Sequence, residues 1–105
     1  MMLMFLMVID NQEERDKLEG LYIAYHKQMF YIANEILKDI HESQDVVQTS
    51  ILKLANYVDK IEDVNCNKTK HLIVTIVRNT AIDNYRRKKN HPVVDLDNYD
   101  NLLKS

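Results

Sequence analysis

Basic side chains gather in one short stretch of an otherwise acidic chain. The chain of 105 residues has a net charge of −2, and residues 1–69 hold 7 basic and 12 acidic side chains. Residues 70–91 reverse this balance, because Asp83 is their one acid and their basic residues are Lys70, Arg78, Arg86, Arg87, Lys88 and Lys89. Cations grouped in this way can follow the phosphates of a nucleic acid. The local excess therefore indicates a polyanion site confined to one surface.

A carboxylate and an amide, Asp45 and Gln48, stand three residues apart in the acidic part of the chain. Residues at this spacing share one face of a helix, so both could hydrogen-bond the same basic, polar partner. A second interpretation is structural. Asp45 would then be a surface acid favoured by the positive start of a helix, and Gln48 an ordinary solvated residue.

Catalytic and metal-binding patterns are missing from the sequence. No nucleophile is paired with a base, and no glycine-rich loop could cradle a nucleotide, so we expect a protein that is not an enzyme. Cys66 and His71, or His41 and Glu42, offer too few ligands for a metal, and we expect no cofactor. The single cysteine excludes a disulfide framework and suits a reducing, cytoplasmic setting.

Long helices must position these side chains, because the chain contains one glycine and one proline. Asp10 or Asn11 can cap a first helix, with Glu13 or Glu14 three residues on, and Gly20 would allow a bend. The apolar positions of that helix advance by three or four residues and predict one buried stripe. They are Leu18, Tyr22, Tyr25, Met29, Ile32 and Ile36.

A second helix is expected to begin at Ser43 as its N-cap, with Asp45 in its first turn. Its apolar stripe repeats the helical spacing and comprises Val47, Ile51, Leu54, Val58 and Ile61. The polar stretch from Glu62 to Thr69 is expected to be a loop.

The third element is ambiguous in composition. His71 to Val77 is rich in β-branched residues and could form a buried strand. The stretch continues without a breaker to Lys89, and no second strand is available to pair with it, so we predict a helix that ends before Pro92. The fold class is therefore all-α, a compact bundle of three main helices at about residues 12–38, 43–61 and 69–89.

The two ends of the chain differ from the predicted bundle. Met1 to Ile9 is an unbroken apolar run, and we expect it to pack on the bundle or on a partner. It is far shorter than the roughly 20 residues that cross a bilayer, so we expect no membrane insertion. Residues 92–105 are acidic and are expected to begin a linker to a further, absent C-terminal domain.

Several segments occur in an order that resembles region 2 of bacterial RNA polymerase sigma factors, of the small extracytoplasmic-function type. They are Leu21–Tyr25, Ala33–Leu37, Ser43–Gln48, Ile51–Leu54 and Ile76–Lys89. The resemblance covers roughly residues 17–91 and implies a region 2 domain over residues 1–91. It also implies core RNA polymerase and promoter DNA as partners, and it leaves open whether an anti-sigma factor binds.

The resemblance implies a polymerase-docking role for the second helix. Asp45 and Gln48 match the acid and amide with which the family binds the coiled coil of the β′ clamp. Gln44 and Ala55 lie at flanking positions of that contact surface. Thr49 departs from the family pattern, which usually has glutamate at this place.

The resemblance assigns the third helix to recognition and melting of the minus-ten promoter element, especially its non-template strand. The family commonly reads Trp-Leu-x-x-Ile-Ala-Arg-Asn here, whereas this chain has Leu72 at the tryptophan position and no tryptophan at all. Asn79 could hydrogen-bond a base edge, and Asp83 could do so or orient Asn79. Arg78, Tyr85, Arg86 and Lys89 share one broad helix face that could follow the DNA backbone, and Lys70, Arg87 and Lys88 add charge.

Two other functions also agree with the sequence. A different helical DNA-binding regulator would bind duplex DNA without polymerase and would give Asp45 and Gln48 no role. A helical protein–protein interaction module would self-associate through Met1–Ile9 and ignore DNA. In that case Arg86 to Lys89 would be a charged helix end stabilised by the negative C-terminal dipole.

Overall fold

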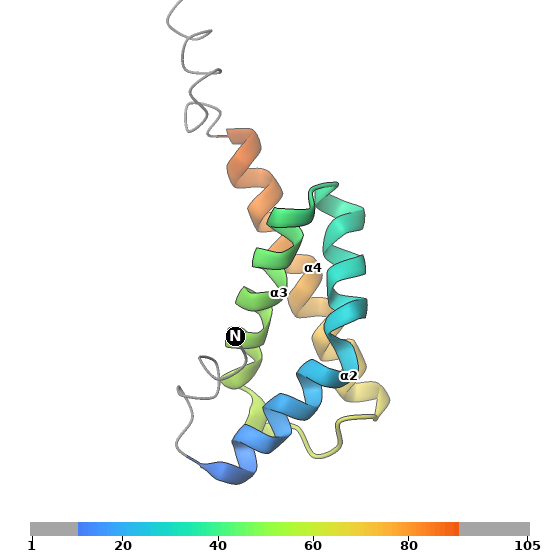
Figure 1. Ribbon diagram of the computed structural model, residues 1–105, viewed down its shortest axis with the longest axis vertical. Coiled ribbons are helices and arrows are strands. Elements are labelled where there is room, and N and C mark those ends of the chain that lie inside the picture. The colour runs from blue at the N-terminus through green and yellow to red at the C-terminus, as the bar shows by residue number, and fades with distance from the viewer. Residues whose placement is uncertain (1–10, 91–105) are drawn as a thin grey trace, which may run out of the picture.

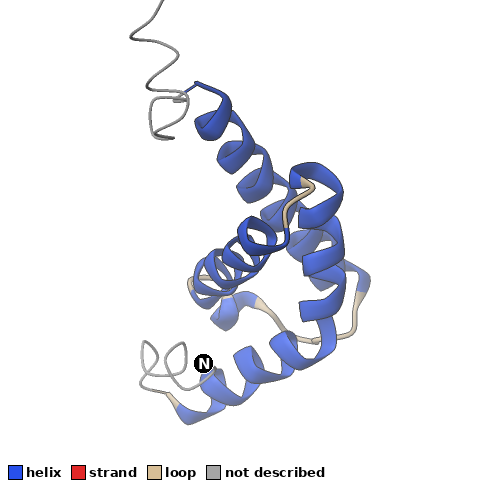
Figure 2. Cartoon of the chain, turned by 45° about the horizontal axis from the view of Figure 1, so that its top comes forward, coloured by secondary structure: helices blue, strands red, loops and turns tan. Residues whose placement is uncertain are grey.

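Three long helices and one short 3-10 helix make up the part of the chain that the computed structural model describes, residues 11–90 (Figure 1). No strand occurs among these residues (Figure 2), which confirms the predicted all-α class with three main helices. The expectations for Met1–Ile9 and for residues 92–105 lie outside the described residues. The elements are α2 (Gln12–Leu37), α3 (Ile40–Ala55), η1 (Val58–Lys60) and α4 (Asn67–Asn90).

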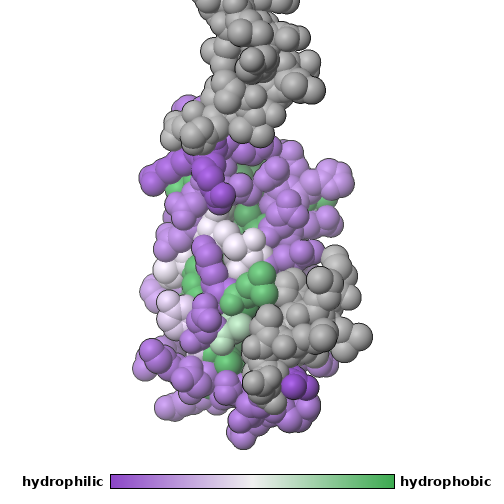
Figure 3. All heavy atoms as spheres, turned by 90° about the vertical axis from the view of Figure 1, so that its left-hand side faces the viewer, coloured by the Kyte–Doolittle hydropathy of each residue, from purple (hydrophilic) through white to green (hydrophobic). Residues whose placement is uncertain are grey.

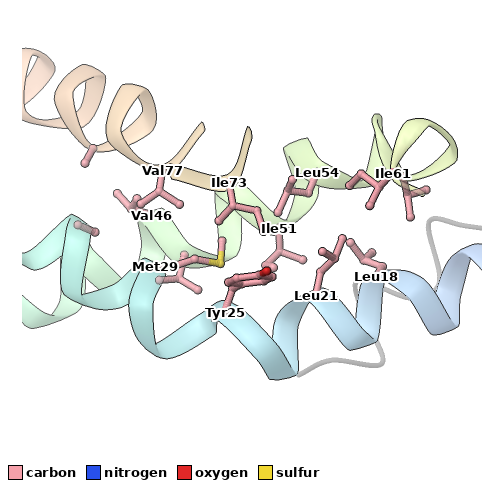
Figure 4. Packing of buried hydrophobic residues seen from close by; sticks show 14 residues of the cluster. Leu18, Leu21, Tyr25, Met29, Val46, Ile51, Leu54, Ile61, Ile73 and Val77 are labelled. Carbon is pink, nitrogen blue, oxygen red and sulfur yellow. The ribbon is translucent and has the colours of Figure 1, made fainter. Parts of the chain in front are cut away.

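The core lies where the three helices pack on one another. Figure 4 shows side chains from α2, α3, α4 and the segment that follows η1 pointing toward a common interior. Each large aliphatic side chain taken out of water there contributes about 1.5–3 kcal/mol. The labelled members are Leu18, Leu21, Tyr25, Met29, Val46, Ile51, Leu54, Ile61, Ile73 and Val77.

The buried face of α2 differs in part from the predicted stripe. Leu21 and Ala33 are fully buried, whereas the predicted Tyr22, Ile32 and Ile36 are only partly buried at the edge of the core. Both α3 and α4 pack on α2, so the line of closest approach is set by two partners. Periodicity along one helix cannot show where that line falls.

Helix α2 is bent, with its N-terminal and C-terminal parts running in different directions in Figures 1 and 2. A Cβ at Gly20 would meet only Val64 Cγ2, at 3.9 Å, so close packing does not require glycine there. His26 places Nδ1 2.8 Å from Tyr22 O, and the two rings stack with centroids 4.6 Å apart. Side chains that bond a carbonyl of the helix ladder are one known cause of helix bending.

Helix α3 begins three residues before the predicted start. Asp39 is the N-cap, and its Oδ1 accepts a hydrogen bond of 3.0 Å from the Glu42 backbone N–H. Ser43, the predicted cap, is fully buried inside the helix, with Oγ 2.6 Å from Asp39 O. Asp45 therefore lies in the second turn of α3 and not in the first.

The segment predicted as the end of the second helix is divided in two. Helix α3 ends at Ala55, and the short helix η1 at Val58–Lys60 follows it. Val58 and Ile61 are nevertheless buried, as their place in the apolar stripe predicts.

Helix α4 confirms the helical interpretation of the third segment and begins at Asn67, two residues early. Ile73, Val77 and Ala81 are buried four residues apart on one face of α4. The loop that precedes α4 is held by side chains from other elements. Tyr25 Oη donates to Val64 O at 2.6 Å, and Lys17 Nζ donates to Ile61 O at 2.6 Å.

Candidate functional site

The outward face of α3 carries the predicted acid and amide pair. The opposite face of the helix packs into the core through Val46, Ile51 and Leu54. Asp45 is exposed and Gln48 is half-buried, one turn farther on. Both side chains can therefore reach a partner laid along α3 without disturbing the core.

The other predicted docking residues flank this pair. Gln44 is exposed and Ala55 is half-buried, and their spacing from Gln48 places them along one side of it. Thr49 is exposed on the other side, on the helical ridge of Glu42 and Lys53. Both of these ridge residues bond side chains of α4, so Thr49 lies near the border between the two helices.

Figure 3 shows the side of the molecule on which α3 lies in Figure 1. Hydrophobic side chains are visible there between hydrophilic ones. One of the exposed large apolar residues of α3 is Leu52, which the sequence prediction did not include. The signal for it was present, because Leu52 lies outside the buried stripe of Val47, Ile51 and Leu54.

The basic residues of α4 are all exposed, but they do not form one surface. Helical spacing places Arg78, Tyr85 and Lys89 on one ridge and Asn79 and Asp83 on the next. Arg86 falls between the two ridges, on the side opposite the buried stripe of the helix. These six side chains therefore share one outward face, on which the sequence analysis had grouped Arg78, Tyr85, Arg86 and Lys89.

Three of the predicted DNA-binding residues lie away from the centre of that face. Lys70 is about 24 Å along the helix axis from Arg86, and it follows the ridge of Val77 and Ala81 toward the bundle. Lys88 lies on the same ridge. Arg87 is exposed near the end of the helix, on the ridge of Asp83.

Two side chains of α4 bind Glu42 in the first turn of α3. Lys88 Nζ lies 3.3 Å from Glu42 Oε1, and Asn84 Nδ2 donates to Glu42 Oε2 at 2.9 Å. Lys89 Nζ lies over the ring of Tyr85, 5.9 Å from its centroid. The C-terminal part of α4 extends beyond the turn between α2 and α3 in Figure 1, and its outward cations Arg86 and Lys89 are exposed.

Leu72 lines a hollow of about 530 Å³ between η1, the loop after it and α4. Tyr57 lines the same hollow and is itself exposed, and the sequence prediction did not include it. Cys66 also lines the hollow, and hydrogen bonds with the side chain and the backbone of Thr69 lower the pKa of its thiol. A smaller hollow of about 220 Å³ is lined by Asn79 and Lys53.

Neither a metal-ligand cluster nor a membrane-spanning helix occurs among the described residues. Residues 11–90 contain no group of three or more His, Cys, Asp or Glu side chains that could hold a metal ion. No helix in that same part of the chain is long and apolar enough to span a membrane.

Comparison with known proteins identifies the family. The model of sigma-70 region 2 matches residues 21–91, a range that contains α3 and α4 whole and most of α2. Neither the curated proteins nor the solved structures contain a match to this chain. The matched family is a transcription initiation factor domain and not a known enzyme family. The chain thus belongs to the sigma-70 family and carries its region 2, the domain with which sigma factors bind RNA polymerase and recognise promoters.

Proposed function

We propose that this domain docks on the coiled coil of the β′ clamp through α3 and recognises and melts the minus-ten promoter element through α4. The observation that supports the docking role is the position of an exposed Asp45 and a half-buried Gln48 one turn apart on α3, away from the core. A carboxylate beside an amide can take hydrogen bonds from a basic partner helix at two adjacent points.

The outward face of α4 supplies the DNA contacts in this proposal. Arg78, Arg86 and Lys89 contact phosphates, while Asn79 and Asp83 on the neighbouring ridge reach base edges. A few phosphate contacts give salt-dependent attraction with little sequence discrimination. Since most of the remaining chain is acidic, we expect weak DNA binding by the isolated protein and useful promoter affinity only on the polymerase.

Strand separation is the most demanding part of the proposed activity. Unstacking a base costs a few kcal/mol, and aromatic stacking returns about 1–3 kcal/mol per base. Leu72 offers no such surface at the position where the family commonly has tryptophan. The non-template strand must therefore be held by the backbone contacts of α4 together with the polymerase.

The docking proposal is tested by binding of the fluorescently labelled chain to core RNA polymerase. We expect saturable binding that the Asp45→Ala/Gln48→Ala double variant loses. The matched control is Gln28→Ala/Glu35→Ala, which removes an exposed amide and an exposed acid from α2 and should bind like the wild type. Equal binding by both double variants would contradict the assignment of α3, and a folded wild-type chain that does not bind would contradict docking altogether.

The DNA proposal is tested on the polymerase complex with a minus-ten promoter fragment. Arg78→Ala and Arg86→Ala should each weaken binding across sequences and reduce the slope of log affinity against log salt by about one. Asn79→Ala should instead change the preference between minus-ten sequences. Strong duplex binding by the chain without polymerase, unaffected by changes in α3, would support the alternative of an independent DNA-binding regulator.

A further inference from the structure

Leu52 is a large apolar side chain that points outward from α3. It is 44% exposed, whereas its neighbours Ile51 and Leu54 are buried. It follows Asp45 by seven residues and Gln48 by four, so the three side chains lie along one face of the helix.

On its own helix, Leu52 has the polar Gln48 and Thr49 one turn before it and the small Ala55 one turn after it. The nearest basic residue along the helix, Lys53, is turned toward α4, where its Nζ donates to Thr80 Oγ1 at 2.8 Å. The outward face therefore presents an apolar side chain next to a carboxylate and an amide, with no lysine or arginine on it. This charge pattern is complementary to a partner surface with an apolar position beside basic side chains.

A single exposed leucine is common on protein surfaces and does not by itself mark an interface. Leu52 differs because it continues the proposed docking pair on a domain whose family binds RNA polymerase. Protein interfaces concentrate their binding energy in a few well-packed side chains surrounded by polar contacts that exclude water. On α3, Leu52 is the large apolar side chain of this outward face, and Asp45 and Gln48 are polar side chains on the same face.

We propose that Leu52 is the apolar anchor of the contact between α3 and core RNA polymerase. This proposal rests on the proposed docking function and adds a specific requirement to it. The polymerase helix must offer an apolar side chain opposite Leu52, flanked by the basic side chains that receive Asp45. Asp45 then determines how binding depends on salt, and Leu52 contributes a part of the binding free energy that salt does not screen.

The test measures binding of the full chain to core RNA polymerase at low and at high salt. If the exposed part of Leu52 is buried on binding, its loss in Leu52→Ala should weaken binding about three- to tenfold. Leu52→Met should bind within about twofold of the wild type, because it keeps the apolar volume. The matched control is Ile23→Ala, which truncates an apolar side chain that is 67% exposed on α2 and should leave binding unchanged.

Comparing binding at two salt concentrations separates the apolar contribution of Leu52 from the electrostatic contribution of Asp45. We expect the loss caused by Leu52→Ala to be the same at both salt concentrations, and the loss caused by Asp45→Asn to shrink at high salt. Leu52→Gln, which keeps a side chain of similar length, should reproduce the loss if the alanine variant proves unstable.

The outcomes distinguish this inference from the function on which it rests. If Leu52→Ala and Leu52→Gln bind like Ile23→Ala while Asp45→Ala/Gln48→Ala fails to bind, the anchor is refuted and the docking face stands. If the double variant binds like the wild type, the docking face itself is refuted, and the anchor with it.

Discussion

Glu42 joins the helix proposed to dock on polymerase to the helix proposed to contact DNA. Its carboxylate lies 3.3 Å from Lys88 Nζ and accepts a hydrogen bond of 2.9 Å from Asn84 Nδ2. Glu42→Gln removes the charge and keeps an oxygen that can accept from Asn84. Glu42→Ala removes both contacts, so the two variants separate the ion pair from the hydrogen bond.

The exposure of the side chains determines the size of each effect. Lys88 is 55% exposed and Glu42 is 27% exposed, so the ion pair is well solvated and is worth about 0.2–1 kcal/mol. The hydrogen bond between Asn84 and a charged carboxylate contributes more, with a lower limit of about 1.5 kcal/mol for bonds of this type. We therefore expect Glu42→Gln to lower the free energy of unfolding by about 0.5 kcal/mol, and Glu42→Ala, which loses the ion pair and the hydrogen bond together, by about 2 kcal/mol.

Thermal unfolding followed by circular dichroism measures both variants. In a domain of this size, 1 kcal/mol corresponds to about 4–8 °C in Tm, so Glu42→Gln should lose about 2–4 °C and Glu42→Ala about 8–16 °C. A double-mutant cycle with Lys88→Met isolates the ion pair and should give a coupling of about 0.2–1 kcal/mol. Wild-type stability of Glu42→Ala, or equal losses for both Glu42 variants, would refute this reasoning.

Two further predictions concern groups whose pKa the fold changes. Tyr25→Phe removes the hydrogen bond to Val64 O, so it should cost about 1 kcal/mol in urea denaturation at neutral pH. Because burial raises the pKa of Tyr25, its protonated form stabilises the wild type, and this contribution should be lost as the pH rises above about 10. If the stability of the wild type and of Tyr25→Phe changed with pH in the same way, the prediction for Tyr25 would be contradicted. Asp39→Asn should keep the helix cap. The Glu42 backbone N–H lowers the pKa of Asp39, so acid unfolding below about pH 4 should weaken the wild type more than this variant. If Asp39→Asn lost as much stability in acid as the wild type, Asp39 would not contribute to the acid sensitivity of the fold.

The spacing of apolar and charged residues along the chain was sufficient to predict the helices and much of the candidate site. The apolar stripe of the second helix predicted the buried positions from Val47 to Ile61, all of which the structure places in the core. The same periodicity left Asp45 on the outward side, and it grouped Arg78, Arg86 and Lys89 on one face. Such predictions succeed because the helical repeat alone determines which residues share a face.

The spacing of residues along the chain gave wrong predictions where a side chain contacts a second helix. Ser43 has the residue type of an N-cap, yet Asp39 caps α3, because Ser43 lies in the contact with α2, where its Oγ is 3.3 Å from Asn34 Oδ1. Lys88 belongs by composition to the basic cluster, yet it pairs with Glu42 across the helix interface. Neither outcome is visible in the spacing of one segment.

The sequence by itself determined that this protein is a bundle of three long helices, with an acid–amide pair on one helix and a basic face on another. It also carried the pattern that identifies sigma-70 region 2. Only the tertiary structure decided that Glu42 joins α3 to α4, and that Tyr25 holds Val64 in the loop before α4. These contacts join residues about 40 positions apart, 42 for Glu42 and Asn84 and 39 for Tyr25 and Val64. Periodicity describes one helix at a time, whereas such contacts depend on how helices pack together.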